Sequence, residues 1–442
     1  MATITPFQGI VYNKDRIQDL KDVVTPPYDV ISERERQEYF DRHPQNVVRL
    51  ILSKEEPDDT EENNRYTRAA RHFHTWLEDG ILKQDSEAAL YLTKIDFRSE
   101  GVVRTRLGFI ALVELEDFGG GILPHEKTFS ATKADRLRLL QACKANFSPV
   151  FSLFSDPDEE IMGLLRSTAE EVYPDADFTE VIGYRHRLWR VTDPKIHQGV
   201  REKLTGRPVY IADGHHRYET ALIYRRQMES QRGGVVPEAP YNSVMMYLTS
   251  MQDPGLIMRS VHRMLCQVPG SAMDGFAEKA GAFFDVETMD IGANGHMGVP
   301  APFLAKIHAG AGQGVMGAVI RGHKASYILR VKKGIMDQLF HVDIAGPLRK
   351  LDVTIATKLL LEKVLGFEEG ALDDERRILY TSRSQKAFDA IDAGTCDVAL
   401  ILNPTRLSEV EETSQAGLIM PRKSTYFFPK VLSGLVMNKL DD

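Results

Sequence analysis

Strand-like runs alternate with stretches of helical periodicity along this chain, and the alternation restricts it to folds that combine helices and sheets. The run 208–212 is short and apolar, and the apolar residues between Tyr218 and Tyr224 that follow it repeat at helical spacing. Near the C-terminus, strand-like runs at 378–380 and 398–402 enclose a helical stretch at 385–391. We therefore predict an α/β fold of the mixed α+β kind.

Local signals predict further elements in the first half of the chain. Ser32 and Glu35 stand at the spacing of a capping box, so a helix should open directly after Ile31. A second helix should run through Tyr66–Leu77 and end near Gly80. A hairpin is expected from strands at 88–97 and 104–116. A third helix is expected at about 134–145.

The length of 442 residues exceeds what one ordinary core holds and allows two or three domains at about 150 residues each. The clearest break lies at 231–240, where glycines and prolines gather. We predict an N-terminal lobe, residues 1–250, that carries the candidate site, and a second α/β lobe, residues 251–442.

Composition excludes several classes of partner. The chain has 55 basic and 63 acidic side chains, a formal charge of -8, so we do not expect nucleic acid to be a partner. No segment has the uncharged length of a membrane span, and the N-terminus lacks a signal-peptide pattern. Cys143, Cys266 and Cys396 form no CxxC pair and fit reduced, structural thiols. These features predict a cytoplasmic protein.

The sequence Asp213-Gly214-His215-His216-Arg217 is the main candidate for chemistry. A tight turn that leads from a strand into a helix presents free backbone N–H groups and the positive end of the helix dipole, which together bind anions. Gly214 leaves room for a phosphate, and Arg217 offers a planar fork for bidentate binding. The alternative is an ordinary N-cap followed by a solvated first helical turn.

A second polar cluster, His125 and Glu126, is expected in a loop. An imidazole beside a carboxylate can perform general acid–base chemistry or hold a metal–phosphate complex, provided that the fold brings the pair to the first turn. A salt-bridged loop and helix start is the alternative reading. Further candidates from polar clusters elsewhere in the chain are Asp29, Arg136, Asn146 and Lys423.

Seven separate stretches, in this order, resemble those of the domain-of-unknown-function family 1015 over nearly the full length of the chain. They are residues 26–31, 46–50, 124–128, 135–137, 146–149, 212–218 and 420–430. The turn at Asp213–Arg217 also resembles the phosphate-binding turn of the ParB/sulfiredoxin superfamily, and particularly that of its free-serine kinases. This resemblance implies a ParB/sulfiredoxin-like N-terminal lobe.

The resemblance implies a kinase that uses ATP or ADP with Mg²⁺ to phosphorylate a small hydroxylated metabolite, with serine-like compounds first. Glu126, Asp213 and His125 would be catalytic, and Asp29 and Asn146 would contact the substrate. A phosphatase or nucleotide hydrolase and a non-catalytic, nucleotide-sensing or ParB-like DNA-associated module are the alternatives. The expected phosphate- and nucleotide-binding residues are Gly214, His215, His216, Arg217, Arg136 and Lys423.

Overall fold

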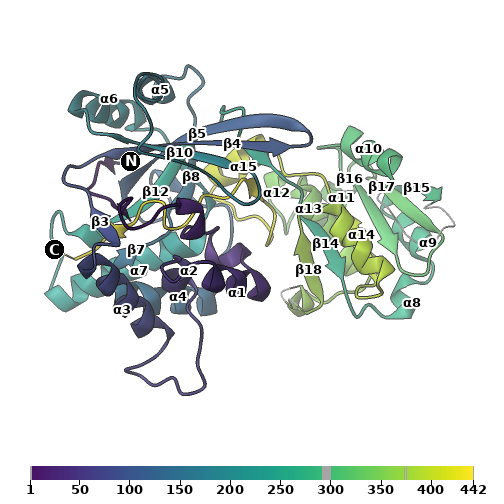
Figure 1. Ribbon diagram of the computed structural model, residues 1–442. Coiled ribbons are helices and arrows are strands. Elements are labelled where there is room, and N and C mark those ends of the chain that lie inside the picture. Colours follow the sequence, from purple (N-terminus) through teal and green to yellow (C-terminus); the bar gives the residue numbers. More distant parts are fainter. Residues whose placement is uncertain (1, 291–299, 373, 375, 442) are drawn as a thin grey trace. The chain divides into compact units, whose positions relative to one another are not determined.

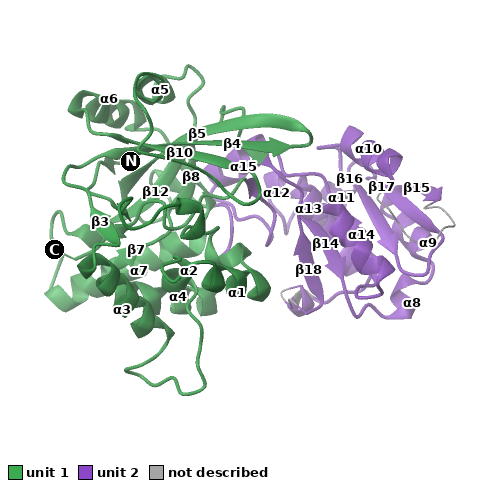
Figure 2. Cartoon of the chain, viewed as in Figure 1, with its two compact units in different colours: residues 1–124, 128–257, 429–442 green, residues 125–127, 258–428 purple. Residues whose placement is uncertain are grey.

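The computed structural model describes residues 2–290, 300–372, 374 and 376–441, and these form two compact units, each with its own sheet (Figures 1 and 2). Unit 1 comprises residues 1–124, 128–257 and 429–442, and unit 2 comprises residues 125–127 and 258–428. Helices accompany the sheet in both units, which confirms the predicted α/β fold class.

Unit 1 is built on a nine-stranded sheet in the order β6-β11-β8-β12-β5-β4-β10-β9, with β1 paired to β5. Strand β8 runs parallel to β12 and antiparallel to β11, and the predicted hairpin is β4–β5. The strands are β1 (Ile4–Thr5), β4 (Leu90–Ser99), β5 (Val102–Glu114), β6 (Ile122–Leu123), β8 (Val150–Phe154), β9 (Ala176–Thr179), β10 (Arg185–Val191), β11 (Val209–Asp213) and β12 (Ser243–Ser250).

Two groups of helices accompany this sheet: in Figure 1, α5 and α6 lie at the top of unit 1, and α3, α4 and α7 lie at the bottom. The predicted capping box opens α1, where the Glu35 N–H donates to Ser32 Oγ and the Ser32 N–H donates to Glu35 Oε2. The helices are α1 (Glu33–Arg42), α2 (Val48–Ile51), α3 (Arg65–Glu78), α4 (Ser130–Cys143), α5 (Met162–Glu171), α6 (Pro194–Leu204) and α7 (His215–Arg232).

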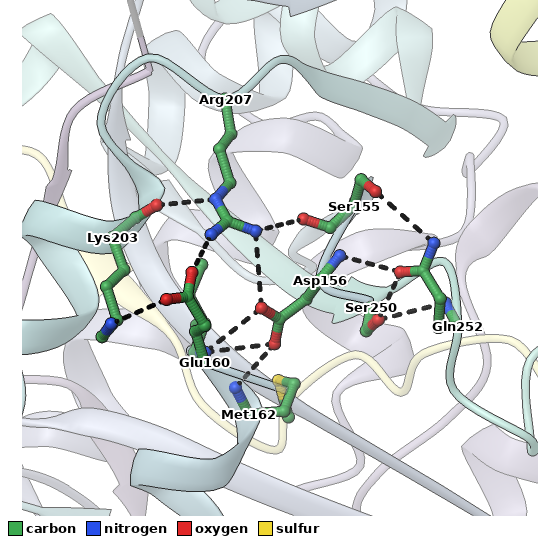
Figure 3. Close-up of polar contacts among 9 residues, drawn as sticks. Ser155, Asp156, Glu160, Met162, Lys203, Arg207, Ser250 and Gln252 are labelled. Atoms are coloured by element: carbon green, nitrogen blue, oxygen red, sulfur yellow. Dashed lines mark hydrogen bonds and ion pairs between the residues drawn. The ribbon is translucent and has the colours of Figure 1, made fainter. Parts of the chain in front are cut away.

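A buried carboxylate, Asp156, ties together the loops at the end of the sheet where β8 and β12 stop (Figure 3). Asp156 is 1% exposed, and its Oδ2 accepts hydrogen bonds from the backbone N–H groups of Ile161 (3.1 Å) and Met162 (2.9 Å), which lead into α5. Arg207 Nη1 lies 3.5 Å from Oδ1, and the Asp156 N–H donates to Gln252 Oε1 (2.7 Å). Arg207 precedes β11 and Asp213 is its last residue, so the two lie at opposite ends of this strand.

The segment after residue 428 returns to unit 1 and runs beside the N-terminal residues, as the yellow and purple traces in Figure 1 show. Its strand β21 (Asn438–Lys439) pairs with β7 (Ala145–Asn146), and the Ile10 N–H donates to the Met437 carbonyl (2.8 Å). A further antiparallel pair is formed by β2 (Ile10–Tyr12) and β3 (Leu82–Gln84). Residues far apart in sequence thus share one unit.

Unit 2 carries a six-stranded sheet in the order β15-β17-β16-β19-β14-β18, whose pairs are all antiparallel. The expected strand–helix–strand alternation near the C-terminus is β18–α14–β19. The strands are β14 (His262–Leu265), β15 (Phe284–Asp290), β16 (Val315–Ile320), β17 (Ala325–Val331), β18 (Ile378–Thr381) and β19 (Val398–Ile401), and the helices of eight or more residues include α10 (Ala301–Ala309), α14 (Ser384–Asp392), α15 (Leu407–Gln415) and a π-helix at Ala356–Val364.

The prediction of three reduced thiols is wrong for two of them, because Cys266 and Cys396 form a disulfide. Strands β14 and β19 are antiparallel neighbours, so their adjoining ends bring these cysteines to a Cα–Cα distance of 4.2 Å despite a sequence separation of 130. Cys143 is free and buried. Among the described residues, no helix has both the length and the apolar character that crossing a membrane requires.

Candidate functional site

The turn at Gly214 joins β11 to α7 as the sequence predicts. Gly214 has φ of +93°, which only glycine adopts without strain, and α7 begins at the next residue. A Cβ built on Gly214 would lie 2.8 Å from the guanidinium of Arg217, so the position needs glycine for space as well as for conformation. The long helix α7 directs its N-terminal N–H groups to this turn.

Asp213 lies between two cations at this turn. Arg217 Nη2 lies 2.6 Å from Asp213 Oδ2, and Lys430 Nζ contacts Oδ1. The side chains of Asp213, Arg217 and Lys430 are only 10%, 12% and 12% exposed. Both carboxylate oxygens are therefore engaged.

The guanidinium of Arg217 is already partly committed to protein acceptors. Nη1 donates to the carbonyl of Pro149 and Nη2 donates to Asp213. The buried Nε has no hydrogen-bond partner among the described residues. Bidentate binding of a ligand through the terminal nitrogens would therefore require one of these contacts to be exchanged.

The two histidines of the turn are packed into the protein. His215 is 3% exposed. His216 Nε2 accepts a hydrogen bond from the Phe129 N–H (2.9 Å), and the His216 ring stacks on that of Phe129 with 6.0 Å between centroids. His216 therefore fixes the start of α4 against α7, a structural contact that a phosphate role would have to share.

Arg136, on α4, lies beside the same turn. Its guanidinium carbon lies 4.1 Å from the centre of the Tyr28 ring, its Nε donates to Asp135 (2.7 Å) and its Nη1 donates to the Ile51 carbonyl (2.7 Å). Burial alone would raise the pKa of Asp135, but Arg136, Tyr66 and Arg65 outweigh it and lower that pKa. The resulting carboxylate holds Arg136 in place.

Tyr28, Asp29 and Asn146 complete the predicted residues of unit 1. Burial raises the pKa of the Tyr28 hydroxyl well above its ordinary value, as does the neighbouring charge of Asp29, so the hydroxyl stays protonated. The Asp29 side chain is exposed. Asn146 Oδ1 accepts from the Met245 N–H (3.3 Å), which ties β7 to β12.

A pocket of about 60 Å³ connects several of these residues. At about 10–15 Å³ for each water-sized group, it has room for about four to six such groups, far fewer than a nucleotide contains. Its polar lining comes from Tyr28, Arg136, Asn146, Ser148, Arg217 and Thr220, and its apolar lining from Ile51, Leu139, Leu140, Ala145, Phe147 and Val244. The structure therefore brings Arg136, Asn146 and Arg217 to one small pocket in unit 1.

His125, Glu126 and Lys423 belong to unit 2. The ring of His125 is buried and its Nε2 lies 2.9 Å from Thr425 Oγ1, while Glu126 forms a parallel β-bridge with Met420. Lys423 has a left-handed backbone conformation, with φ of +54°. These three residues are thus grouped with the 420–425 segment, and the other predicted residues are grouped around β11, α4 and α7.

Sequence reasoning missed Lys430, Tyr28 and Thr220 as members of the candidate site. Lys430 contacts Asp213 from 217 positions away, and no local pattern reports such a contact. A signal was present for two of the three, because Tyr28 and Lys430 lie inside stretches that carry the family resemblance. Among the described residues, no three His, Cys, Asp or Glu side chains gather into a metal site.

Comparison with solved structures gives weak similarities. A mutant of free serine kinase in complex with AMP is 11% identical, with 70% of this chain and 84% of that chain covered and a TM-score of 0.35. SbnI with a C-terminal truncation, from Staphylococcus aureus, is 10% identical over 73% and 85% of the two chains, with a TM-score of 0.34. A conserved hypothetical protein from Pyrococcus furiosus is 12% identical over 70% and 87%, with a TM-score of 0.31.

Comparison with curated proteins gives no match. A family model described as "Protein of unknown function (DUF1015)" matches residues 4–354, which is most of the chain and includes all the candidate site residues except Lys423 and Lys430. The match agrees with the resemblance carried by the sequence motifs. The chain belongs to the DUF1015 family.

Proposed function

We propose that this protein is a nucleotide-dependent phosphotransferase that phosphorylates a small hydroxylated metabolite. Serine-like compounds are the first candidates for this acceptor. One observation carries the proposal: a glycine turn, the N-terminus of α7 and a small pocket lined by Arg136 and Arg217 meet at one end of β11. Backbone N–H groups at a helix start and guanidinium groups are the donors that phosphates and other oxyanions bind.

In this proposal the phosphates of ATP or ADP lie at the turn of Gly214, His215, His216 and Arg217, with Arg136 as a further phosphate-binding residue. The small pocket, with Asn146 and the nearby Asp29, would hold part of the acceptor, because its volume suits a group of only a few non-hydrogen atoms. Mg²⁺ would bind mainly through the nucleotide phosphates, as it does in many phosphoryl-transfer sites.

Transfer breaks the bond between the terminal phosphorus and its bridging oxygen and forms a bond from that phosphorus to the acceptor oxygen. The acceptor proton passes to a general base, and Glu126, His125 and Asp213 are the candidates that the sequence predicts. Asp213 is the weaker candidate, because Arg217 and Lys430 engage both of its oxygens. We assign Asp213 the role of orienting these two cations.

The proposal is tested by incubating the protein with Mg²⁺ and ATP or ADP, with and without a panel of small hydroxylated metabolites that includes L-serine. Mass spectrometry and ³¹P NMR should detect a phosphorylated acceptor only when a suitable acceptor is present. Nucleotide loss that does not depend on the acceptor would instead show a hydrolase. Nucleotide binding without turnover would favour a sensing module, and binding of duplex DNA at physiological salt would favour a ParB-like role.

The role of Glu126 has its own test. If Glu126 is the general base, Glu126→Gln should lower turnover by roughly 10²–10⁴-fold and leave nucleotide affinity nearly unchanged, because the amide keeps the shape but cannot take the proton. Glu78→Gln, which changes an exposed glutamate at the end of α3, is the matched control and should retain full turnover. Normal turnover in Glu126→Gln would remove this residue from the mechanism.

A further inference from the structure

Thr220 is a buried polar residue in the pocket between α4 and α7 with no evident structural task. Its side chain is 2% exposed, and its hydroxyl has no hydrogen-bond partner among the described residues. A threonine inside a helix usually donates its hydroxyl to the carbonyl four residues earlier. Thr357 follows this pattern, donating to the Val353 carbonyl (2.8 Å), but the buried helical threonines Thr220 and Thr413 do not. Of these two, Thr220 lines the pocket.

A second unsatisfied donor lies on the same face of α7. Arg217 and Thr220 are three residues apart in the helix, a spacing that places their side chains side by side, and both line the pocket. The Nε–H of Arg217 is buried and has no partner in the part of the chain that the structure describes. Buried polar groups without partners are rare, because each costs the free energy of its lost hydration.

The other polar groups of the pocket are also mainly donors. The guanidinium of Arg136 covers the ring of Tyr28, and the protonated Tyr28 hydroxyl adds a further O–H. Asp213, the carboxylate that pairs with Arg217, also contacts Lys430. A small pocket lined by two guanidinium groups and by hydroxyl groups is complementary to a ligand group that has negatively charged oxygens.

We propose that Thr220 is a specificity-determining residue, whose hydroxyl, together with the Arg217 Nε–H, donates a hydrogen bond to a small oxyanion that fills this pocket. The oxyanion is a carboxylate or a phosphate group, and the volume of about 60 Å³ admits either. The inference deepens the proposed function, since the pocket would hold part of the acceptor. Its test requires no phosphoryl transfer.

The experiment measures the dissociation constants of acetate and inorganic phosphate for the full chain by calorimetry, at fixed ionic strength with chloride as the balancing anion. The wild type should bind at least one of the two. The anion that binds shows whether the pocket takes a carboxylate or a phosphate group. Thr220→Val keeps the shape and removes the hydroxyl, and it should weaken binding about tenfold or more, the effect of one charge-assisted hydrogen bond. Thr220→Ser should restore binding.

A stability measurement separates recognition from folding. Because the Thr220 hydroxyl has no partner among the described residues, Thr220→Val should leave the unfolding temperature unchanged or raise it. Thr249→Val is the matched control: it removes another buried hydroxyl, which donates to the Leu107 carbonyl, and should lower the unfolding temperature without changing anion affinity.

The inference is overturned if neither anion binds the wild type, if Thr220→Val binds as tightly as the wild type, or if Thr249→Val weakens binding equally. Intact anion binding together with a failure to phosphorylate any acceptor would refute the proposed reaction and leave the role of Thr220 standing.

Discussion

At the scale of single residues, Gly214 is placed under two constraints at once. An alanine there would have to adopt φ of +93° and would press its Cβ against the Arg217 guanidinium at 2.8 Å. We expect Gly214→Ala to lower the free energy of unfolding by on the order of 1–3 kcal/mol and to weaken nucleotide binding, because Arg217 must move. Urea unfolding and calorimetric titration measure the two effects.

Gly119→Ala separates these constraints. Gly119 has φ of +100°, but a Cβ at this position would meet no atom of the described residues within 4 Å, apart from its chain neighbours. This variant should show the conformational cost alone. Equal stability losses in the two variants, with nucleotide affinity retained in Gly214→Ala, would mean that the contact with Arg217 has no role in binding.

Arg217 is the second residue whose substitution tests the proposed phosphate site. Lysine keeps the charge but lacks the Nε–H and cannot contact Asp213 and the Pro149 carbonyl with separate nitrogens. Arg217→Lys should therefore weaken the binding of ATP or ADP by roughly tenfold or more, an effect of about 1.4 kcal/mol or larger. Fluorescence titration with a labelled nucleotide measures this change.

Arg226→Lys is the control for Arg217→Lys, because Arg226 lies on the same helix, is 61% exposed and pairs with Asp117 at the surface. It should bind nucleotides like the wild type. Unchanged affinity in Arg217→Lys would return this turn to an ordinary strand–helix connection.

At the scale of elements, the Asp156 network shown in Figure 3 stabilises the start of α5 and the edge of the sheet at which β8 and β12 end. Asp156→Asn removes the charge that the Ile161 and Met162 N–H groups and Arg207 share. The free energy of unfolding should fall by about 1.5–3 kcal/mol, the range for hydrogen bonds to charged groups.

Asp177→Asn is the comparison, since it removes a carboxylate from a half-exposed pair with Arg185 that should contribute at most about 1 kcal/mol. Chemical denaturation of both variants checks the difference. If Asp156→Asn is no more destabilised than Asp177→Asn, the network positions the loops but adds little to the free energy of unfolding.

Elements were predictable where the signal was local, and the long-range contacts of the candidate site were not. The Ser32–Glu35 capping box and the strand–turn–helix at Gly214 depend on residues within a few positions of one another, and both form as predicted. Lys430 beside Asp213 and Cys266 beside Cys396 are brought together by strand pairing and by the return of the chain to unit 1. Nothing in the spacing of these residues encodes either contact.

The same limit applies to the second polar cluster. The motif of His125 and Glu126 is correctly placed outside the helices, but its partners, Thr425 and Met420, lie about 300 residues later. The pocket at Thr220 could not be found either, because a threonine in a helix gives no sequence signal that its hydroxyl lacks a partner.

At the scale of the whole molecule, unit 2 should make stability depend on pH through Asp352. Burial, and then the charge of Glu409, raise the pKa of Asp352 to about 7, against contributions from Asn403 and Arg406 that lower it. The folded state therefore binds this proton more tightly than the unfolded chain. The stabilisation is complete below about pH 4 and is lost as the pH rises through about 7.

Asp352→Asn should remove this dependence. Relative to the variant, the wild type should lose on the order of 4 kcal/mol between about pH 4 and pH 7, at 1.36 kcal/mol for each pKa unit. Urea denaturation of both proteins across this range, followed by a probe in unit 2, gives the difference. Parallel pH profiles would show that the Asp352 carboxyl is ionised at the same pH in the folded and unfolded states.

The return of residues 429–442 to unit 1 has a consequence for biosynthesis. A ribosome completes most of unit 1 by residue 257 and then makes all of residues 258–428 before Lys430 emerges. At about 5–20 residues per second, that interval lasts roughly ten to thirty seconds. Throughout it, the nascent chain holds Asp213 and Arg217 without their third partner, so the proposed phosphate site matures only after translation has passed residue 430.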